Sequence, residues 1–543
     1  MITTNRLRLR LSALRLNNAP RPGTRRPDVL RLGALRGATV ATASALAALA
    51  SAIWLEHHAH LGMDVVVTAV ALSVTLARVQ RGAGHQDRLI GVLVIAASAA
   101  VASEVGSLLV RHPILGDAAF VTAMAGAIWI RRFGARATKA GTFLVLPFVA
   151  LLVTHTEGAR PYAADHDAWS ALIAVVAASW VWLGQLLATA VRFDRPRPRP
   201  TSRPSPAGST KRRIPASTRM ALQMAAALTT AFAAGHLVFH EHWPWAVLTA
   251  FIVCSGARGR GDVLHKSIER ACGAAVGTAI ATWIAGALPA HDRWSIVLIF
   301  TVLAIAGWLR EISYALWAGS VTAVLSLLYG YYGQSAPSLL LTRLEAILVG
   351  AALGAAASWL ILPVRTGDVF KRRVADALAA LSDFLGTPIG DRAEARQRGA
   401  RFLQTAELLE QIAKPIRTHR MLLRRAHSAR RPRRTTGHAP GPAAHPASHP
   451  PAHPADAIDA VRACIAPVEL LAKAFADTPP EPTPAWAGLQ GAVAANLGTV
   501  RRRLGGRGSA GPAYRRLPHP ASTSAGSALL ELDAALAALD RAV

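Results

Sequence analysis

Two short motifs place an acid, an arginine and a glycine at matching points of the chain. Asp87-Arg88-Leu89-Ile90-Gly91 and Glu269-Arg270-Ala271-Cys272-Gly273 both follow basic residues and lead into apolar runs. A guanidinium is a planar fork of donors that can hold a carboxylate through two hydrogen bonds. The motifs therefore predict a pathway for an anion, with Asp87, Arg88, Glu269 and Arg270 as candidate residues. The structural alternative is that the acid favours a helix N-terminus while the arginine reaches lipid headgroups.

Other ionisable residues lie inside or beside apolar runs. Glu104 is a candidate for proton coupling, because an acid within a membrane is costly and is functional by default. Glu345 is a second candidate, although interfacial pairing with Arg343 is the simpler explanation. Histidines titrate near neutral pH, so those at the ends of two runs are candidates for pH sensing, with a solvated loop as the simpler explanation. These are His58, His60, His240 and His242.

The sequence offers no constellation for catalysis. It has no GxxxxGK[ST] loop, HExxH motif or paired cysteines, and its three cysteines do not have the spacing of a zinc site. We therefore expect neither an enzyme nor a bound metal or cofactor. Aromatic residues that could stack on an aromatic ligand, but that more simply serve packing, are Trp180, Trp283, Trp308, Trp317, Trp359 and Tyr314.

The elements that must position these residues are membrane-spanning helices. Residues 36–191 and 216–363 are dominated by Ala, Val, Leu, Ile and Gly, in apolar stretches near the length that crosses a bilayer. The predicted fold is an all-α polytopic membrane helix bundle with about twelve spans and a helical cytoplasmic C-terminal region. The predicted spans are 36–55, 63–80, 88–110, 114–130, 139–154, 168–191, 219–239, 243–256, 268–288, 294–309, 314–332 and 342–362.

The two apolar regions resemble copies of one another. The Asp/Glu-Arg-x-x-Gly motifs are separated by 182 residues, and His58 and His60 fall on His240 and His242 at the same offset. Six spans per copy is an even number, so both copies have the same orientation in the membrane. The sequence predicts two parallel six-helix repeats.

The formal net charge of +29 is distributed unevenly. Lysines and arginines gather in alternate loops, as the positive-inside rule requires of cytoplasmic loops. This orients the chain and removes the need for a nucleic-acid partner. The predicted organisation is a basic cytoplasmic arm (1–35), a first repeat (36–191), a disordered Arg/Pro linker (192–215), a second repeat (216–363) and a cytoplasmic helical tail (364–543) with a Pro/His-rich insert (430–456).

The second repeat resembles the fusaric acid resistance family, which includes aromatic acid exporters. The resemblance is carried by Trp243-Pro-Trp245 and its apolar run, by the Glu269-Arg270 motif, and by Arg343-Leu-Glu345 leading into Gly350 and Gly354. It is clear over about 215–365 and weaker over 30–191, where Leu61-Gly-Met replaces Trp-Pro-Trp. It implies an inner-membrane efflux protein for organic, often aromatic, carboxylates.

The resemblance adds Trp243, Trp245 and Arg343 to the pathway candidates. The tryptophans are expected at the outer membrane interface, where amphipathic rings gather. The run 243–256 is short for a span, and we expect a short or tilted helix beside the pathway.

The function expected from these observations is efflux of organic anions driven by an ion gradient, in the cell membrane. A passive anion channel and a membrane scaffold that acts through its tail stay open as alternatives. The expected partners are a small organic anion and membrane lipids. A homo-oligomer is also open, as is a periplasmic adaptor if the envelope has two membranes.

Overall fold

The computed structural model describes residues 27–59, 64–81, 84–154, 166–190, 214–285, 292–310, 313–331, 337–388, 390–430, 453–477, 481, 483–506, 513–517 and 524–543. Every regular element in these residues is helical, which confirms the predicted all-α class. The chain forms two compact units. We call residues 28–199 with 203–366 the membrane unit, and residues 367–543 the tail unit. The 192–213 part of the linker, His60 and residues 431–452 of the insert lie outside the described residues.

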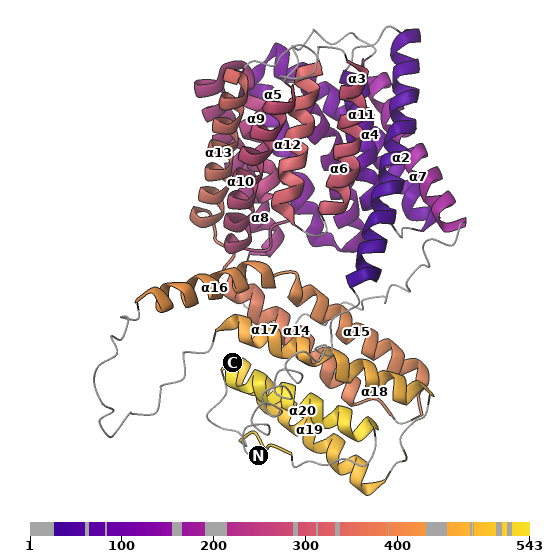
Figure 1. The fold of residues 1–543 in the computed structure, drawn as a ribbon, viewed down its shortest axis with the longest axis vertical. Helices are drawn as coiled ribbons and strands as arrows, with labels where there is room; N and C mark the ends of the chain where they lie inside the picture. Colours follow the sequence, from indigo (N-terminus) through magenta and orange to yellow (C-terminus); the bar gives the residue numbers. More distant parts are fainter. Residues whose placement is uncertain are drawn as a thin grey trace, which may run out of the picture. The chain divides into compact units, whose positions relative to one another are not determined.

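The membrane unit contains twelve α-helices in its described residues (Figure 1). Seven segments are long and apolar enough to cross a membrane, and three shorter apolar helices accompany them. The predicted polytopic membrane bundle is thereby confirmed. The helices are α2 (Pro27–Ala59), α3 (Asp64–Val79), α4 (His85–Arg111), α5 (Pro113–Trp129), α6 (Ala135–Thr154), α7 (His166–Ala190), α8 (Ala216–Ala234), α9 (Trp243–Cys254), α10 (Arg260–Ala285), α11 (Arg293–Leu309), α12 (Tyr314–Tyr331) and α13 (Pro337–Leu360).

The helices of the two halves pack in the same pattern. Helix α4 packs against α6 and α7, just as α10 packs against α12 and α13, and α3 meets α7 as α9 meets α13. These contacts are those expected of two copies of one six-helix unit. The halves meet where α5 and α6 contact α8 and α9. Their shared core includes Phe120 and Phe148 from the first half and Phe232 and Trp243 from the second.

The short helix α9 is enclosed by protein. It has 12 residues, so at 1.5 Å per residue it is about 18 Å long, well below the ~30 Å of bilayer hydrocarbon. Eleven of those residues are buried, between α8, α13 and α6. A helix that does not face lipid does not need to match the bilayer thickness. This explains the short apolar run at 243–256 and corrects the expected interfacial position of Trp243 and Trp245, whose side chains are buried.

The turn between α8 and α9 has an unusual backbone. Helix α8 continues into a π-helix, η2 (Gly235–Phe239), and a 3₁₀ turn, η3 (His240–His242), before α9 begins with Trp243-Pro244. His240 has φ of 46°, a left-handed value that is uncommon for residues other than glycine. A Cβ added to Gly235 would lie 2.8 Å from the Trp243 Cβ, so glycine permits this close reversal.

Helices α10 and α12 approach closely along a seam of glycines. A Cβ added to Gly273 would lie 2.3 Å from the carbonyl oxygen of Ala315, and one added to Gly277 would lie 2.2 Å from that of Gly319. Backbones can touch at this separation only without side chains, which is how small residues act between membrane helices. The seam fixes the position of the α10 residues one turn earlier, including Arg270.

The tail unit is a helical domain with its own hydrophobic core. Phe384, Phe402, Leu471, Leu497 and Leu536 are among its buried residues. Its helices are α14 (Thr366–Leu385), α15 (Arg392–Glu410), α16 (Ala413–Arg430), α17 (Pro454–Ala463), α18 (Ile465–Asp477), α19 (Pro484–Leu504) and α20 (Ser524–Ala542).

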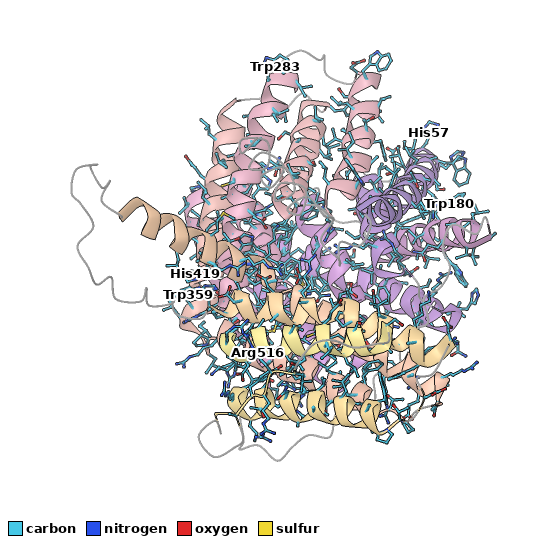
Figure 2. The ribbon with its side chains drawn as sticks, turned by 60° about the horizontal axis from the view of Figure 1, so that its bottom comes forward. His57, Trp180, Trp283, Trp359, His419 and Arg516 are labelled. Atoms are coloured by element: carbon cyan, nitrogen blue, oxygen red, sulfur yellow. The ribbon has the colours of Figure 1, made fainter. Side chains whose placement is uncertain are left out.

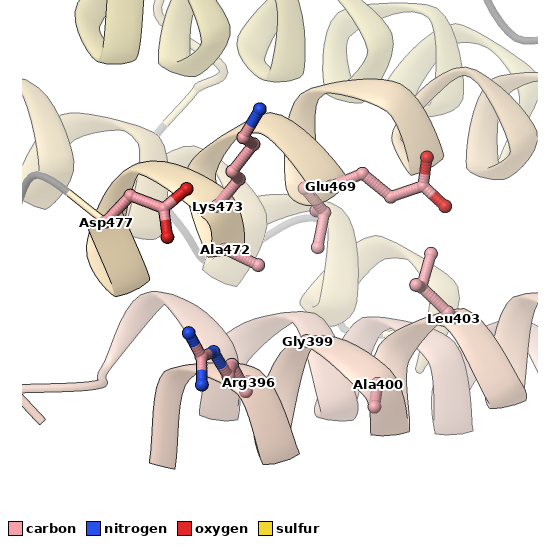
Figure 3. Close-up of a pocket in the computed structure, with 9 residues that line it drawn as sticks. Arg396, Gly399, Ala400, Leu403, Glu469, Ala472, Lys473 and Asp477 are labelled. Carbon is pink, nitrogen blue, oxygen red and sulfur yellow. The ribbon is translucent and has the colours of Figure 1, made fainter. Parts of the chain in front are cut away.

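A groove of about 390 Å³ lies between α15 and α18 in the tail unit. Small residues, Gly399, Ala400 and Ala472, form its floor (Figure 3). Charged side chains, among them Arg396 and Lys473, border it. The groove, with its small residues and charged borders, belongs to the tail unit.

Candidate functional site

Two ends of the membrane unit are distinguished below. We call the end at which α7 ends and α8 begins the linker end, and the opposite end the far end. Gln185 near the end of α7 donates to Ala77 near the end of α3, so α3 ends and α4 begins at the linker end. Gly261 at the start of α10 donates to Thr366 beyond α13, which places the start of α10 beside the end of α13. Helices α4, α6, α10 and α12 therefore all begin at the linker end. The predicted candidates divide between these ends.

Arg270 on α10 is buried at the linker end of the second half. Its side chain is 2% exposed, and its Nε and Nη1 have no hydrogen-bond partner among the described residues. The phenol of Tyr314, at the start of α12, acts electrostatically on the guanidinium. Burying a cation with unpartnered donors is expensive. The structural alternative required the arginine to reach lipid headgroups, and its burial rules this out. Its Nε and Nη1 can instead donate to an acceptor inside the protein.

Aromatic rings surround the entrance to this region. Tyr314 and Trp317 lie with ring centroids 5.5 Å apart, and the Arg310 guanidinium lies 4.3 Å from the Trp317 ring centroid. Glu269 turns to the neighbouring His265 on α10, whose Nε2 lies 3.5 Å from its Oε1. An anion near Arg270 would thus meet a phenol and an indole as well as a cation.

Arg88 on α4 holds the matching position in the first half. It is 6% exposed, and its Nε has no partner among the described residues. The amide of Gln80 is buried beside the same face of α4, with its Nε2 3.4 Å from where a Cβ on Gly91 would stand. Neither the Nε2 nor the Oε1 of Gln80 has a hydrogen-bond partner among the described residues. Asp87 forms an ion pair with Lys139 on α6. The two motifs therefore bury their arginines in equivalent places, with different neighbours.

Other arginines at the linker end lie on tryptophan rings near the bundle surface. Arg132 is 4.0 Å from the Trp129 ring centroid, and Arg260 is 4.7 Å from that of Trp359. Such cation–π contacts suit residues at a membrane interface. Trp359 and Trp283 are 45% and 83% exposed and project from the helices that carry them (Figure 2). They resemble interfacial residues more than parts of an enclosed site.

A second group of predicted residues meets at the far end. Arg343 on α13 is 2% exposed, and its guanidinium lies 5.6 Å from the Trp245 ring centroid. The imidazole of His242 stacks on the indole of Trp245, with ring centroids 4.6 Å apart. The packing of α9 against α13 thus brings Arg343 to His242 and Trp245, which lie about a hundred residues earlier in the sequence.

The predicted acids face away from the bundle. Glu104 and Glu345 are exposed, and Glu104 accepts a 3.3 Å hydrogen bond from Ser107 one turn later on α4. Among the histidines, His58 and His240 are exposed, and His60 lies outside the described residues. In the described part of the chain, no three His, Cys, Asp or Glu side chains are grouped closely enough to hold a metal.

The sequence analysis missed one ionisable pair. Asp117 on α5 and His236 on η2 are joined by a 3.0 Å hydrogen bond between Oδ2 and Nε2, at the contact between the halves. Neither residue belongs to a repeated motif. The apolar run around each was the only signal, since Asp117 falls near the start of one predicted span and His236 near the end of another.

Comparison with known proteins identifies the second half. Residues 227–357 match the family model described as fusaric acid resistance protein-like. The predicted family resemblance is confirmed. The match runs from α8 to the last turn of α13, so it contains Arg270, Trp243, Trp245 and Arg343. No curated protein and no solved structure matches the chain.

The fusaric acid resistance protein-like segment therefore holds both buried arginines of the second half, one near each end of the bundle. A buried guanidinium can bind a carboxylate and release it when the surrounding helices admit water. Arg270 with Tyr314 at the linker end, and Arg343 with Trp245 at the far end, form the candidate site.

Proposed function

We propose that this protein is an efflux transporter of organic anions, with aromatic carboxylates as its substrate class and an ion gradient as its energy source. The observation that carries the proposal is the buried Arg270 guanidinium, whose Nε and Nη1 donors have no hydrogen-bond partner in the part of the chain that the structure describes. A carboxylate would accept from both donors and neutralise the charge. Its binding thus offsets the cost of burying the cation, and specificity for anions follows.

The aromatic preference is supported by the rings beside Arg270. Tyr314 acts electrostatically on the guanidinium, and its ring centroid lies 5.5 Å from that of Trp317, so a ligand with a carboxylate on a ring could make an ionic contact with Arg270 and an aromatic contact with Tyr314 at once. The family match is consistent with this class of substrate. Arg343 and Trp245 repeat the same combination of a cation and an indole at the far end.

The direction of transport follows from the predicted orientation. The linker end carries the stacked surface arginines Arg132, Arg260 and Arg310, which raise the local concentration of anions. An anion would pass from this end to Arg270, and then toward Arg343 at the far end.

The test is efflux of benzoate from proteoliposomes that contain the purified protein. Arg270→Ala removes charge-assisted hydrogen bonds worth about 1.5–3 kcal/mol, so efflux should fall about tenfold or more. Arg270→Lys retains the charge without the planar fork and should give an intermediate rate. Arg132→Ala, which removes only one of several surface cations at the same end, is the matched control and should lower efflux far less than Arg270→Ala does. Efflux by folded Arg270→Ala at the wild-type rate would contradict the proposal.

A further inference from the structure

One pair of ionisable side chains joins the two halves of the membrane unit. Asp117 belongs to the first turns of α5 in the first half, and His236 belongs to η2 in the second half. The Asp117 Oδ2 accepts a 3.0 Å hydrogen bond from the Nε2–H of His236. The contact is near the far end, opposite the buried arginines of the linker end.

The surroundings of this pair are aromatic and largely apolar. The His236 imidazole is stacked on Phe232, with ring centroids 6.1 Å apart, and lies 5.1 Å from the Trp243 ring centroid. The Asp117 Oδ1 is buried and has no hydrogen-bond partner among the described residues. A carboxylate in this position is costly unless a cation is beside it.

His236 is the titratable group that acts electrostatically on Asp117. The other ionisable residues at this end, on the elements packed around the pair, are either exposed or lie against Trp245. Arg111 and Glu104 on α4, His112 before α5, His240 and Glu241 on η3, and Glu345 on α13 are exposed, while His242 and Arg343 lie against Trp245. Helices α6, α8 and α9 contribute no ionisable side chain there within the described residues.

The backbone that carries His236 is suited to local movement. Residues 235–239 form a π-helix, in which the normal hydrogen-bond ladder is widened, and such segments occur often at functional sites. His240 follows in a left-handed conformation, which costs energy that the surrounding packing must hold. A change in the Asp117–His236 contact would therefore act directly on the strained turn into α9.

We propose that Asp117 and His236 form the proton-binding pair that couples protonation to the contact between the two halves. This inference rests on the proposed function, because it assigns the coupling ion and its site. His236 takes one proton from water at the far end onto Nδ1, while its Nε2–H donates to Asp117 throughout. The net charge of the pair then changes from −1 to 0.

The sign of the coupling follows from the burial of the carboxylate. With the proton bound, the imidazolium compensates Asp117 and the α5–η2 contact is stabilised. Without it, the half-buried Asp117 carboxylate is left uncompensated, and separation of the halves at the far end is favoured. Proton uptake from the far end therefore closes that end after the anion leaves. Loss of the proton toward the linker end then favours its reopening, so one proton moves opposite to each anion.

The first test measures benzoate efflux from proteoliposomes with and without an imposed proton gradient. If one proton exchanges for one anion, a one-unit pH gradient can support about a tenfold anion gradient. Asp117→Asn and His236→Gln should lose this dependence and retain efflux down the anion gradient. His112→Gln and Glu241→Gln, which change exposed residues close to the pair, should keep it. Variants are compared only after size-exclusion chromatography confirms that they are folded.

The same assay separates this pair from Glu104. Loss of gradient dependence in Glu104→Gln, with Asp117→Asn behaving as wild type, would overturn the proposal. A wild-type response to the gradient in both Asp117→Asn and His236→Gln would also overturn it.

A second measurement does not depend on transport. Protonation of His236 changes the field at the Trp243 ring, so tryptophan fluorescence of the purified protein should titrate with pH. This change of fluorescence with pH should be lost in His236→Gln and retained in His112→Gln. If wild-type protein moves no anion yet shows this titration, the proposed function fails and the proton-binding pair stands. If the titration is unchanged in His236→Gln, the pair does not bind the proton and the inference is overturned.

Discussion

Arg270 is the residue whose surroundings are hardest to explain by stability alone. Its side chain is 2% exposed, and two of its donors have no partner among the residues that the structure describes. Arg132 and Arg260, by contrast, lie on tryptophan rings nearer the surface. Replacing buried charged groups by apolar side chains of similar volume is often neutral or stabilising. A group kept at such a cost is expected to serve binding.

Replacing Arg270 by an apolar side chain should therefore have opposite effects on the stability of the protein and on its transport activity. Arg270→Met should leave the thermal stability of the membrane unit unchanged or raise it by about 1–4 kcal/mol, because a desolvated cation is removed. The same variant should lose benzoate efflux. Thermal unfolding in detergent and proteoliposome efflux measure the two effects. A strongly destabilised Arg270→Met, with Arg132→Met unaffected, would instead assign Arg270 a structural role.

A second residue-scale prediction concerns pH and the tail unit. The Tyr514 hydroxyl donates to Asp533, 2.7 Å from Oδ1, and burial together with this carboxylate raises the pKa of Tyr514. A raised pKa in the folded state stabilises the fold below the unfolded pKa of tyrosine, near 10, and this contribution is lost as pH rises above that value. The tail should therefore unfold more readily above about pH 10.

Cys464 can report this loss, because its thiol is buried and burial raises its pKa to about 12. In full-length protein with Cys254→Ala and Cys272→Ala, a thiol reagent should react with Cys464 faster as pH passes 10. Tyr514→Phe should react faster at pH 8, and its rate should depend less on pH in the alkaline range. Identical rates in both proteins at every pH would contradict the assigned role of Tyr514.

The sequence predicts single residues well where a motif repeats and poorly where contacts come from the fold. Arg88 and Arg270 were found because each stands in an Asp/Glu-Arg-x-x-Gly motif. Asp117 and His236 were not, because their pairing depends on how α5 meets η2 across the halves. Trp243 was expected at the lipid interface, since nothing in its own run indicates that α8, α13 and α6 enclose α9.

At the scale of elements, the close approach of α10 and α12 determines where Arg270 lies. Gly273 and Gly277 are one and two turns after it, and both meet carbonyl oxygens of α12. Any side chain here must push the helices apart. The same change would move Arg270 away from Tyr314.

We therefore predict that Gly277→Ala destabilises the membrane unit by about 1–3 kcal/mol, as overpacking of a close contact does. It should also reduce benzoate efflux. Gly126→Ala in α5 is the control, because an added Cβ there meets nothing within 4 Å and alanine favours a helix. Thermal unfolding in detergent compares the two. Equal stability of both variants would show that the seam is looser than described.

Most boundaries of the predicted spans agree with the helices to within five residues, but α2 and α10 begin nine and eight residues earlier than predicted. Breaks between helices were not predicted. In the tail unit, short breaks divide two pairs of helices, α15 from α16 and α17 from α18. Pro415 and Pro467 each stand in the first turn of the second helix, where the missing N–H costs little and the preceding turn cannot continue. The π-helix at 235–239 has no comparable sequence signal, because it arises from the reversal into α9.

At the scale of the whole molecule, the chain combines a membrane unit and a tail unit with separate cores. All candidate residues of the anion pathway belong to the membrane unit. The tail has its own ion pairs, such as those of Arg417 with Glu410 and Asp459. The two units can therefore have separable roles.

Deletion of residues 368–543 tests this separation. We expect the remaining membrane unit to retain benzoate efflux in proteoliposomes, because the buried arginines and the contact between the halves are unchanged. Arg270→Ala in the shortened chain should abolish that efflux as it does in the full chain. Loss of efflux from a shortened chain that is folded would show that the tail is required for transport.

The most direct test of the account is whether the wild-type protein moves organic anions. Efflux of several aromatic carboxylates is measured from proteoliposomes, with and without an imposed proton gradient, against liposomes that lack protein. The account predicts efflux that requires the protein and accelerates when protons can move in the opposite direction. Absence of flux for every anion, from protein shown to be folded, would contradict it and favour a membrane scaffold that acts through its tail.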